Sequence, residues 1–594
     1  MKRTLLCLAL SSALLGCASH SANEPVAAVA TQGQQQAFDA LVNDFIPAFW
    51  QQYPTWGLYV GHAEHAGDLE IPTAQARAKD LAFVALWEQK LAAIDIQALA
   101  APKQIDYLLI KNQLGSIRFG IEELKSWQWD PSEYNVAGGI AQLATGSFAP
   151  LEVRLRAISE RLAKTPAYYA AARSNIQNPT LEHTQLAVVQ NQGAFSIIND
   201  DLLAQAKSST LSDAEKAQFE KAYHKAKAAI KAQIDWLQAL ESDLEEQGNA
   251  RSFRLGEDLY EKKFAFDIQS GLTAKELYNK ALADKAAVLK EMNRITDQLW
   301  SRYFPGQPRL AGNAGVKKLI DKLAKRHVAR DGFVDAVKAQ IPELEAFVNQ
   351  HQLLTLDPNK PLVVRETPEY MRGVAGASIS APGPYDKGGN TYYNVTPLDG
   401  MTDAQAESYL REYNHWMLQV LNIHEAIPGH YAQLVYSNQS PSLVKSLFGN
   451  GAMVEGWAVY AERMMLEAGY GNNEPELWLM YYKWNLRTIC NTILDYSVHV
   501  LNMSEDKALD LLMNDAFQEE AEARGKWRRV SLSQVQLTSY YAGYREIYDF
   551  REAQKKDLGD KFDLKAFNEQ FLSYGSSPVR YIKALMSGQE IQAQ

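Results

Sequence analysis

Apolar residues recur at helical spacing through most of the first 350 residues, and this periodicity most constrains the fold. One helix is predicted to begin at Ser212, with Glu215 three residues later, and another at Thr273, with Glu276 at the same offset. Both pairs have the spacing of a capping box. The apolar residues that follow are Phe219, Tyr223, Ala226, Ile230, Ile234 and Leu237, and then Leu277, Ala281, Val288, Met292, Ile295 and Leu299. We interpret both stripes as core-facing surfaces and not as a cofactor site.

Residues 361–397 have a different pattern. β-Branched and aromatic residues form two short runs, Leu362–Val364 and Thr391–Val395, separated by Pro and Gly pairs. Such runs between turn residues predict a small β-sheet. Helical patterning resumes after Thr402, which has Gln405 at the capping-box position. The predicted fold class is therefore mainly α, a large helical fold with a small sheet beside the active-site cleft.

The N-terminus predicts export and not part of the fold. Lys2 and Arg3 precede a short apolar stretch, and Leu14-Leu15-Gly16-Cys17 resembles a bacterial lipobox. We expect residues 1–16 to be a signal peptide and Cys17 to be lipidated; the alternative is a secretory signal in which Cys17 is incidental. Because Ala18 and not Asp follows Cys17, the resemblance to Gram-negative lipoproteins favours the outer membrane, facing the periplasm.

Composition limits the remaining possibilities. Residues 17–35 are rich in Ser, Ala and Gln and are predicted to be a flexible tether. The whole sequence is 46% apolar, which is enough to bury a large core. We therefore expect residues 36–594 to form one large catalytic unit, or two lobes with a cleft between them. A net charge of −10 argues against a nucleic-acid partner. With Cys7 cleaved and Cys17 acylated, Cys490 has no disulfide partner.

The segment His424-Glu425-Ala426-Ile427-Pro428-Gly429-His430 carries the chemistry. Zinc peptidases usually place two His four residues apart on a helix, with a Glu after the first as the base. Here the second His is six residues on, which leaves the two about 120° apart on an ideal helix. A break at Pro428-Gly429 would bring His430 back towards His424. The alternative is two successive helices whose His are simply hydrogen-bonded.

Glu455 supplies the expected third ligand. It lies 25 residues after His430 within an apolar run, Val454–Glu462, where an acid is not expected to face water. Gly456, Ala458 and Ala461 are small enough to let this helix approach the first one closely. With His424 and His430, Glu455 would leave one coordination position of a zinc ion open for water.

These motifs together resemble the bacterial family of domain of unknown function 885, grouped with the Glu-zincin metallopeptidases. The likeness also includes Tyr53–Gly57, Leu255–Tyr260, Thr391–Val395, Arg487, Asp495, His499, Tyr540–Gly543 and Arg551. It implies a mostly helical peptidase with a deep channel.

Roles follow for the outlying residues. Arg487, Asn491, Asp495 and His499 recur every four positions, so they either hold the zinc ligands from behind or form a buried structural network. Tyr540 is expected to donate to the oxyanion, as in oligopeptidases, although tyrosines so close together often only pack. We expect Thr391–Val395 to be an edge strand that pairs with the peptide. The candidate substrate-binding residues are Tyr393, Asn394, Tyr541 and Arg551.

The sequence therefore predicts a zinc-dependent peptidase at the periplasmic or cell surface, with Glu425 as general base and Tyr540 assisting. The membrane is expected to be contacted only through the lipid. Two alternatives remain: a non-catalytic lipoprotein that uses the fold for binding or envelope assembly, and a metal hydrolase of a non-peptide amide. A base beside the metal ligands favours an enzyme over a binding module.

Overall fold

The computed structural model describes residues 26–591, apart from 147, 368–375 and 386–389. Cys17 and the signal peptide lie outside the described residues. The chain is mainly helical with one small sheet, which confirms the coarse fold class. No helix in the described part is long and apolar enough to cross a membrane.

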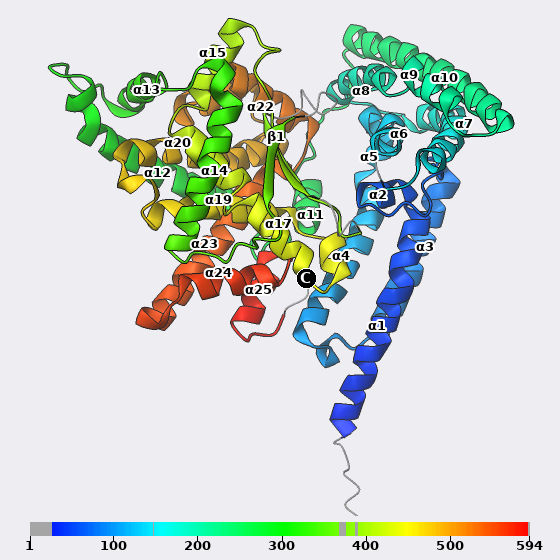
Figure 1. Ribbon diagram of the computed structural model, residues 1–594, viewed down its shortest axis with the longest axis horizontal. Helices are drawn as coiled ribbons and strands as arrows, with labels where there is room; N and C mark the ends of the chain where they lie inside the picture. The colour runs from blue at the N-terminus through cyan, green and yellow to red at the C-terminus, as the bar shows by residue number, and fades with distance from the viewer. Residues whose placement is uncertain (1–25, 147, 368–375, 386–389, 592–594) are drawn as a thin grey trace, which may run out of the picture.

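The N-terminal part, residues 26–247, consists of helices and connecting loops, with no strand among its described residues, and occupies one side of Figure 1, coloured blue to teal. Its α-helices are α1 (Val26–Gln52), α2 (Pro54–Tyr59), α3 (Ala74–Ala92), α4 (Ala101–Phe119), α5 (Ser126–Trp129), α6 (Ala137–Thr145), α7 (Leu151–Asn175), α8 (Leu181–Gly193), α9 (Asp200–Ser208) and α10 (Asp213–Gln247). Helix α1 begins inside the segment expected to be a tether. Ala and Gln, which suggested flexibility there, are also good helix formers, so residues 26–35 continue the helix.

The C-terminal part contains the sheet and the remaining helices, which fill the other side of Figure 1. The helices before the sheet are α11 (Glu257–Asp267), α12 (Ala274–Tyr303), α13 (Gly312–Leu323) and α14 (Phe333–Gln350). Those after it are α15 (Asp403–Glu412), α16 (Met417–Glu425), α17 (His430–Gln439), α18 (Leu443–Leu447), α19 (Gly451–Glu467), α20 (Pro475–His499), α21 (Glu505–Asp510), α22 (Glu520–Leu532), α23 (Ser539–Leu558), α24 (Leu564–Ser573) and α25 (Val579–Met586). Short 3₁₀ or π segments lie at Ile96–Ala98, Gly120–Leu124, Pro131–Glu133, Ala194–Ser196, Arg330–Gly332, Tyr470–Asn473, Leu511–Asp515, Gln536–Thr538 and Gly559–Lys561.

The predicted helix caps are confirmed. Ser212, Thr273 and Thr402 each cap a helix through a complete capping box, at the starts of α10, α12 and α15. The apolar stripes of α10 and α12 are buried, apart from half-buried Val288. In the described part of the chain, buried apolar residues form one large core, mainly from α11 to α25, and three smaller cores mainly among α1–α10. One smaller core includes Leu447 and Phe448, so it joins the N-terminal part to the end of α18.

The sheet has three strands, β1 (Leu362–Glu366), β2 (Ala377–Ser380) and β3 (Thr391–Val395), in the order β1-β3-β2. Strand β3 is parallel to β1 and antiparallel to β2. The expectation that Thr391–Val395 forms an edge strand is therefore wrong. Both sides of β3 are paired within the sheet, and alternation of side chains along one strand does not reveal strand order.

Candidate active site

A break between α16 and α17 brings the two histidines together. Helix α16 ends at Glu425 and α17 begins at His430, as the Pro-Gly pair predicted. The intervening turn is held by Gly429 N–H, which donates to Ile423 O at 3.0 Å, and by Trp457 Nε1, which donates to Pro428 O at 2.9 Å. A Cβ at position 429 would lie 1.9 Å from the carbonyl oxygen of His424, so only Gly fits there.

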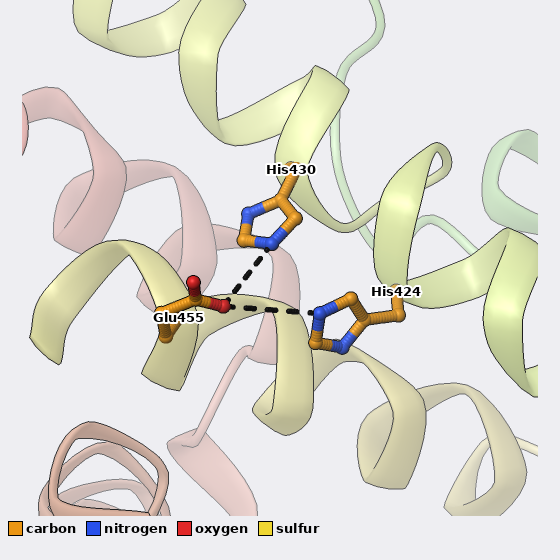
Figure 2. A group of neighbouring side chains, drawn as sticks. All are labelled: His424, His430 and Glu455. Carbon is orange, nitrogen blue, oxygen red and sulfur yellow. Dashed lines mark ion pairs between the residues drawn. The ribbon is translucent and has the colours of Figure 1, made fainter. Parts of the chain in front are cut away.

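His424, His430 and Glu455 converge from three helices, as Figure 2 shows. Oε2 of Glu455 lies 3.4 Å from Nε2 of His430 and 3.9 Å from Nε2 of His424. One ligand atom from each residue lies within 4.8 Å of the others. Ligands around a tetrahedral zinc ion are separated by about 3.3 Å, given metal–ligand bonds of about 2.0 Å. Two imidazoles and one carboxylate are a donor set that zinc takes, and their atoms, which lie within 4.8 Å of one another, would draw closer together around a bound ion.

Glu462 contacts the ring nitrogen of His424 that faces away from Glu455. Its Oε1 lies 2.6 Å from Nδ1 of His424 and also accepts a hydrogen bond from Trp484 Nε1 at 2.9 Å. A carboxylate on one ring nitrogen fixes the tautomer and leaves the other nitrogen free as a ligand. Glu462 is fully buried two turns after Glu455 on α19. Its place in an apolar run was the available signal, but the sequence alone assigned it no role.

Burial and mutual contact shift the pKa values of these residues. Burial, together with nearby His430, lowers the pKa of His424 to about 3, which keeps this ring neutral. Burial would lower the pKa of His430, but the hydrogen bond and charge of Glu455 outweigh it and raise that pKa. Burial raises the pKa of Glu425 to about 7. A carboxyl group poised near neutrality can take up and release a proton, and a cation beside it would lower this pKa.

His424 joins the ligand cluster to a cavity of about 1130 Å³. His424, Glu425, Arg487 and Tyr540 are among the residues that line it. Ala377, the first residue of β2, lines it as well, so an edge of the sheet borders the site. The structure thus brings the expected base and the expected oxyanion donor into the same space as the metal ligands.

Tyr540 reaches the site because α19 and α23 pack very closely. A Cβ at Gly456 would lie 2.3 Å from the carbonyl carbon of Gly543, and one at Gly543 would lie 1.7 Å from Ala452 O. The small residue Gly456 therefore serves the contact with α23 and not, as expected, the approach to α16. Burial would raise the pKa of Glu455, but the hydrogen bond and charge of His430 lower it, with a smaller contribution from a hydrogen bond to the Tyr540 hydroxyl.

The four expected substrate-binding residues do not line this cavity. Tyr393 is buried and donates to Asn422 Oδ1 at 2.8 Å, and Asn394 is buried between Arg365 and Ser380. Tyr541 donates to Asp284 Oδ2 at 2.7 Å, away from the neighbouring Tyr540. Successive helical residues point in different directions, so the two tyrosines cannot share a role.

Arg551 is likewise structural. Its guanidinium lies 2.6 Å from Glu467 Oε2 and packs on the rings of Tyr460 and Tyr548. The side chain is 3% exposed. Arg551 is thus paired with Glu467 and does not face the cavity in which a substrate was expected to meet it.

The polar stripe of α20 divides between two roles. Arg487 lines the cavity, whereas Asp495 accepts hydrogen bonds from the backbone of Val535 and Leu537, both at 3.1 Å. His499 Nε2 bonds to the backbone oxygens of Val530 and Ser533 at 2.9 and 3.0 Å. Among the described residues, neither Asp495 nor His499 contacts a metal ligand. A 25-residue helix is about 37 Å long, so its far end belongs to a buried network that shapes the turn before α23.

The sequence places this chain in a known bacterial protein family. The chain belongs to the family described as bacterial protein of unknown function (DUF885), which matches residues 54–586. No curated protein matches the chain.

Two solved structures resemble it. A candidate lipoprotein of unknown function from Shewanella oneidensis is 63% identical, with a TM-score of 0.87, over 93% of this chain and 99% of that one. A candidate lipoprotein from Colwellia psychrerythraea is 18% identical, with a TM-score of 0.73 over the same shares, and shows a common fold.

Proposed function

We propose that this chain is a zinc-dependent peptidase. The observation that carries the proposal is the convergence of His424, His430 and Glu455, together with the cavity that His424 lines with Glu425 and Tyr540. A zinc ion held there would polarise the scissile carbonyl and acidify a water molecule. The resemblance of the motif to Glu-zincin metallopeptidases supports the same chemistry.

Each residue then has a distinct task. Glu425 accepts the proton of the attacking water and passes it to the leaving amine. Tyr540, which also lines the cavity, donates a hydrogen bond to the oxygen that becomes negative in the transition state. Glu462 keeps the Nε2 of His424 directed at the ligand cluster.

Strand β2 takes over the substrate-pairing role that was expected of β3. It is an edge strand of the sheet, and Gly376 and Ala377 line the cavity beside the ligands. An extended peptide that paired with β2 would place its backbone along the cavity wall. This arrangement favours peptides over other amides, because a short amide would gain nothing from the strand.

The proposed location is the periplasmic face of the outer membrane, with Cys17 as the lipidated residue. The sequence Leu14–Cys17 supports the lipid anchor, as does the description of the 63%-identical Shewanella oneidensis protein as a candidate lipoprotein. Replacing Cys17 by Ser should move the protein into the soluble fraction. Retention of the Cys17→Ser protein on membranes after a high-salt wash would refute the anchor.

The activity test compares three proteins on one mixed peptide library, with zinc measured in the same samples. Glu425→Gln should keep its zinc and lose hydrolysis by about 10²–10⁴-fold, because the amide cannot accept the proton. His430→Ala should lose both zinc affinity and rate. Equal hydrolysis by Glu425→Gln would place the activity elsewhere. If the zinc-loaded natural protein hydrolyses no peptide, the result favours the alternative function, a lipoprotein that binds a ligand or takes part in envelope assembly.

A further inference from the structure

Lys526 is a buried lysine without a partner in the described part of the chain. The other two buried lysines, Lys445 and Lys483, are ion-paired with Asp106 and Glu412. Lys526 is 5% exposed, lines the active-site cavity, and forms no hydrogen bond or ion pair with any described residue. Buried charges are normally paired, because an unpaired one loses its hydration without compensation.

Two arginines line the cavity with Lys526. Arg487 pairs with Glu522 at 2.6 Å, yet its Nη1 is buried without a hydrogen-bond partner in the described structure. Arg529, three residues after Lys526 on α22, bonds only to neutral partners, Gln536 Oε1 at 2.6 Å and Tyr540 OH at 3.3 Å. Arg487, Arg529 and Lys526 thus share one neighbouring acid, Glu522. Burial and the charge of Arg487 lower the pKa of Lys526 well below its usual value, so its amine is without the counter-charge that would hold it protonated.

The other acids on this wall lie further away or are engaged. Glu519 also lines the cavity but is exposed at the start of α22, seven residues or about 10 Å along the helix from Lys526. Glu412 is paired with Lys483 at 2.6 Å. The cationic wall is therefore not neutralised by its surroundings.

This cationic wall lies one side chain from the metal ligands on each side. Arg529 contacts Tyr540, which lies beside Glu455. Arg487 stacks on Trp484 with 5.0 Å to the ring centroid, and the Trp484 ring packs edge-on against His424 with 6.2 Å between the ring centroids. A group bound by these cations would belong to the same ligand as the group at the metal site.

We propose that Lys526, Arg487 and Arg529 form a subsite for a carboxylate of the substrate. The proposal rests on the peptidase function only in calling that ligand a substrate. Carboxylates form the strongest hydrogen bonds with Lys and Arg, and they supply the counter-charge that Lys526 lacks. A peptide offers two such groups, its C-terminus and its acidic side chains. Because the subsite adjoins the metal ligands, a bound C-terminus would lead to removal of residues from that end.

A binding measurement tests the subsite without requiring hydrolysis. The probes are N-acetyl-L-phenylalanine and its amide, which differ only in the carboxylate, titrated calorimetrically into the protein as purified. We expect the acid to bind about tenfold or more tightly than the amide, as charge-assisted hydrogen bonds imply. Lys526→Met should abolish this preference and Lys526→Arg should retain most of it. Equal affinity for acid and amide in the natural protein, or an undiminished preference in Lys526→Met, would overturn the proposal.

Two controls separate binding from folding. Arg529→Gln should weaken acid binding, whereas Arg528→Gln, on the adjacent residue outside the cavity, should not. Lys526→Met should melt at the same temperature as the natural protein or higher, because it removes an unpaired buried charge. A lower melting temperature would show that Lys526 supports the fold instead.

The source of the carboxylate is resolved with four peptides of one sequence, with a free or amidated C-terminus and with or without an internal Glu. Faster cleavage of both free-ended peptides identifies the C-terminus; faster cleavage of both Glu-containing peptides identifies a side chain. The Lys526→Met protein should cleave free-ended and amidated peptides at the same rate, and likewise peptides with and without the internal Glu. If no peptide is cleaved but the acid still binds through Lys526, the peptidase function fails and the carboxylate subsite stands.

Discussion

Glu462 Oε1 lies 2.6 Å from Nδ1 of His424, which leaves Nε2 as the ring nitrogen that faces Glu455. The same carboxylate oxygen accepts from Trp484, so its position is fixed from two sides. This contact explains how a histidine in the last turn of α16 can be oriented for metal binding.

Glu462→Gln should therefore lower zinc affinity by about tenfold or more, since an amide is a weaker partner for Nδ1 of His424 than a carboxyl group is. Competition with a chromophoric chelator measures this directly. Glu467→Gln, one turn further along α19, is the matched control: Glu467 pairs with Arg463 and Arg551 and should not affect zinc. Unchanged affinity in Glu462→Gln would show that the contact is irrelevant to the metal.

The neighbouring tyrosines on α23 should respond differently to loss of their hydroxyls. Tyr540→Phe should reduce peptide hydrolysis by about 10²–10³-fold while zinc stays bound, as expected for a missing oxyanion donor. Tyr541→Phe should leave hydrolysis intact and lower the free energy of unfolding by about 1 kcal/mol, because only the bond to Asp284 is lost. The account of Tyr540 is wrong if both variants hydrolyse peptides equally well.

Gly429→Ala should destabilise the protein by about 1–3 kcal/mol or more, because the new Cβ would collide with the backbone oxygens of Ile423 and His424. The α16–α17 turn must open, so zinc should bind more weakly too. Gly193→Ala serves as the control, since Gly193 has a helical φ of −61° and free space around it. It should be neutral or slightly stabilising. Thermal unfolding and zinc titration of the two variants test this prediction. Equal stability and equal zinc affinity in Gly429→Ala and Gly193→Ala would contradict it.

His499 predicts a pH dependence of stability. Burial lowers its pKa to about 4, so between about pH 6.5 and 4 the unfolded chain binds the proton and the folded chain does not. The contribution of His499 is thus complete above about pH 6.5 and is lost as the pH falls through this window, by up to about 1.4 kcal/mol per unit.

Urea unfolding at pH 7.5 and 4.5 measures this effect. His499→Gln should lose less stability than the natural protein on acidification, whereas the exposed His224→Gln should behave like the natural protein. Parallel losses in all three would exclude His499 as the source.

The sequence predicted those features that depend on local pattern. Capping boxes, helical stripes, the small sheet and the break at Pro428-Gly429 all follow from residues close together in the chain. The grouping of His424, His430 and Glu455 was also predictable, because a helix break at Pro428-Gly429 compensates for the irregular His spacing and Glu455 stands in an apolar run.

Features set by tertiary packing were not predictable. Strand order places β2 and not β3 at the edge, and the Gly456–Gly543 contact decides which tyrosine meets the site. Asp495 and His499 shared a helix stripe with Arg487, but the length of α20 separates them from the ligands. Lys526 became visible only when its lack of a partner could be compared with Lys445 and Lys483.

The central claim is that His424, His430 and Glu455 bind one zinc ion. Elemental analysis of the protein, purified without chelators and shown to be folded, tests it most directly. We expect about one zinc per chain, falling towards zero in His430→Ala and remaining near one in Glu425→Gln. A folded natural protein with no zinc, and with no uptake when zinc is supplied, would contradict the account.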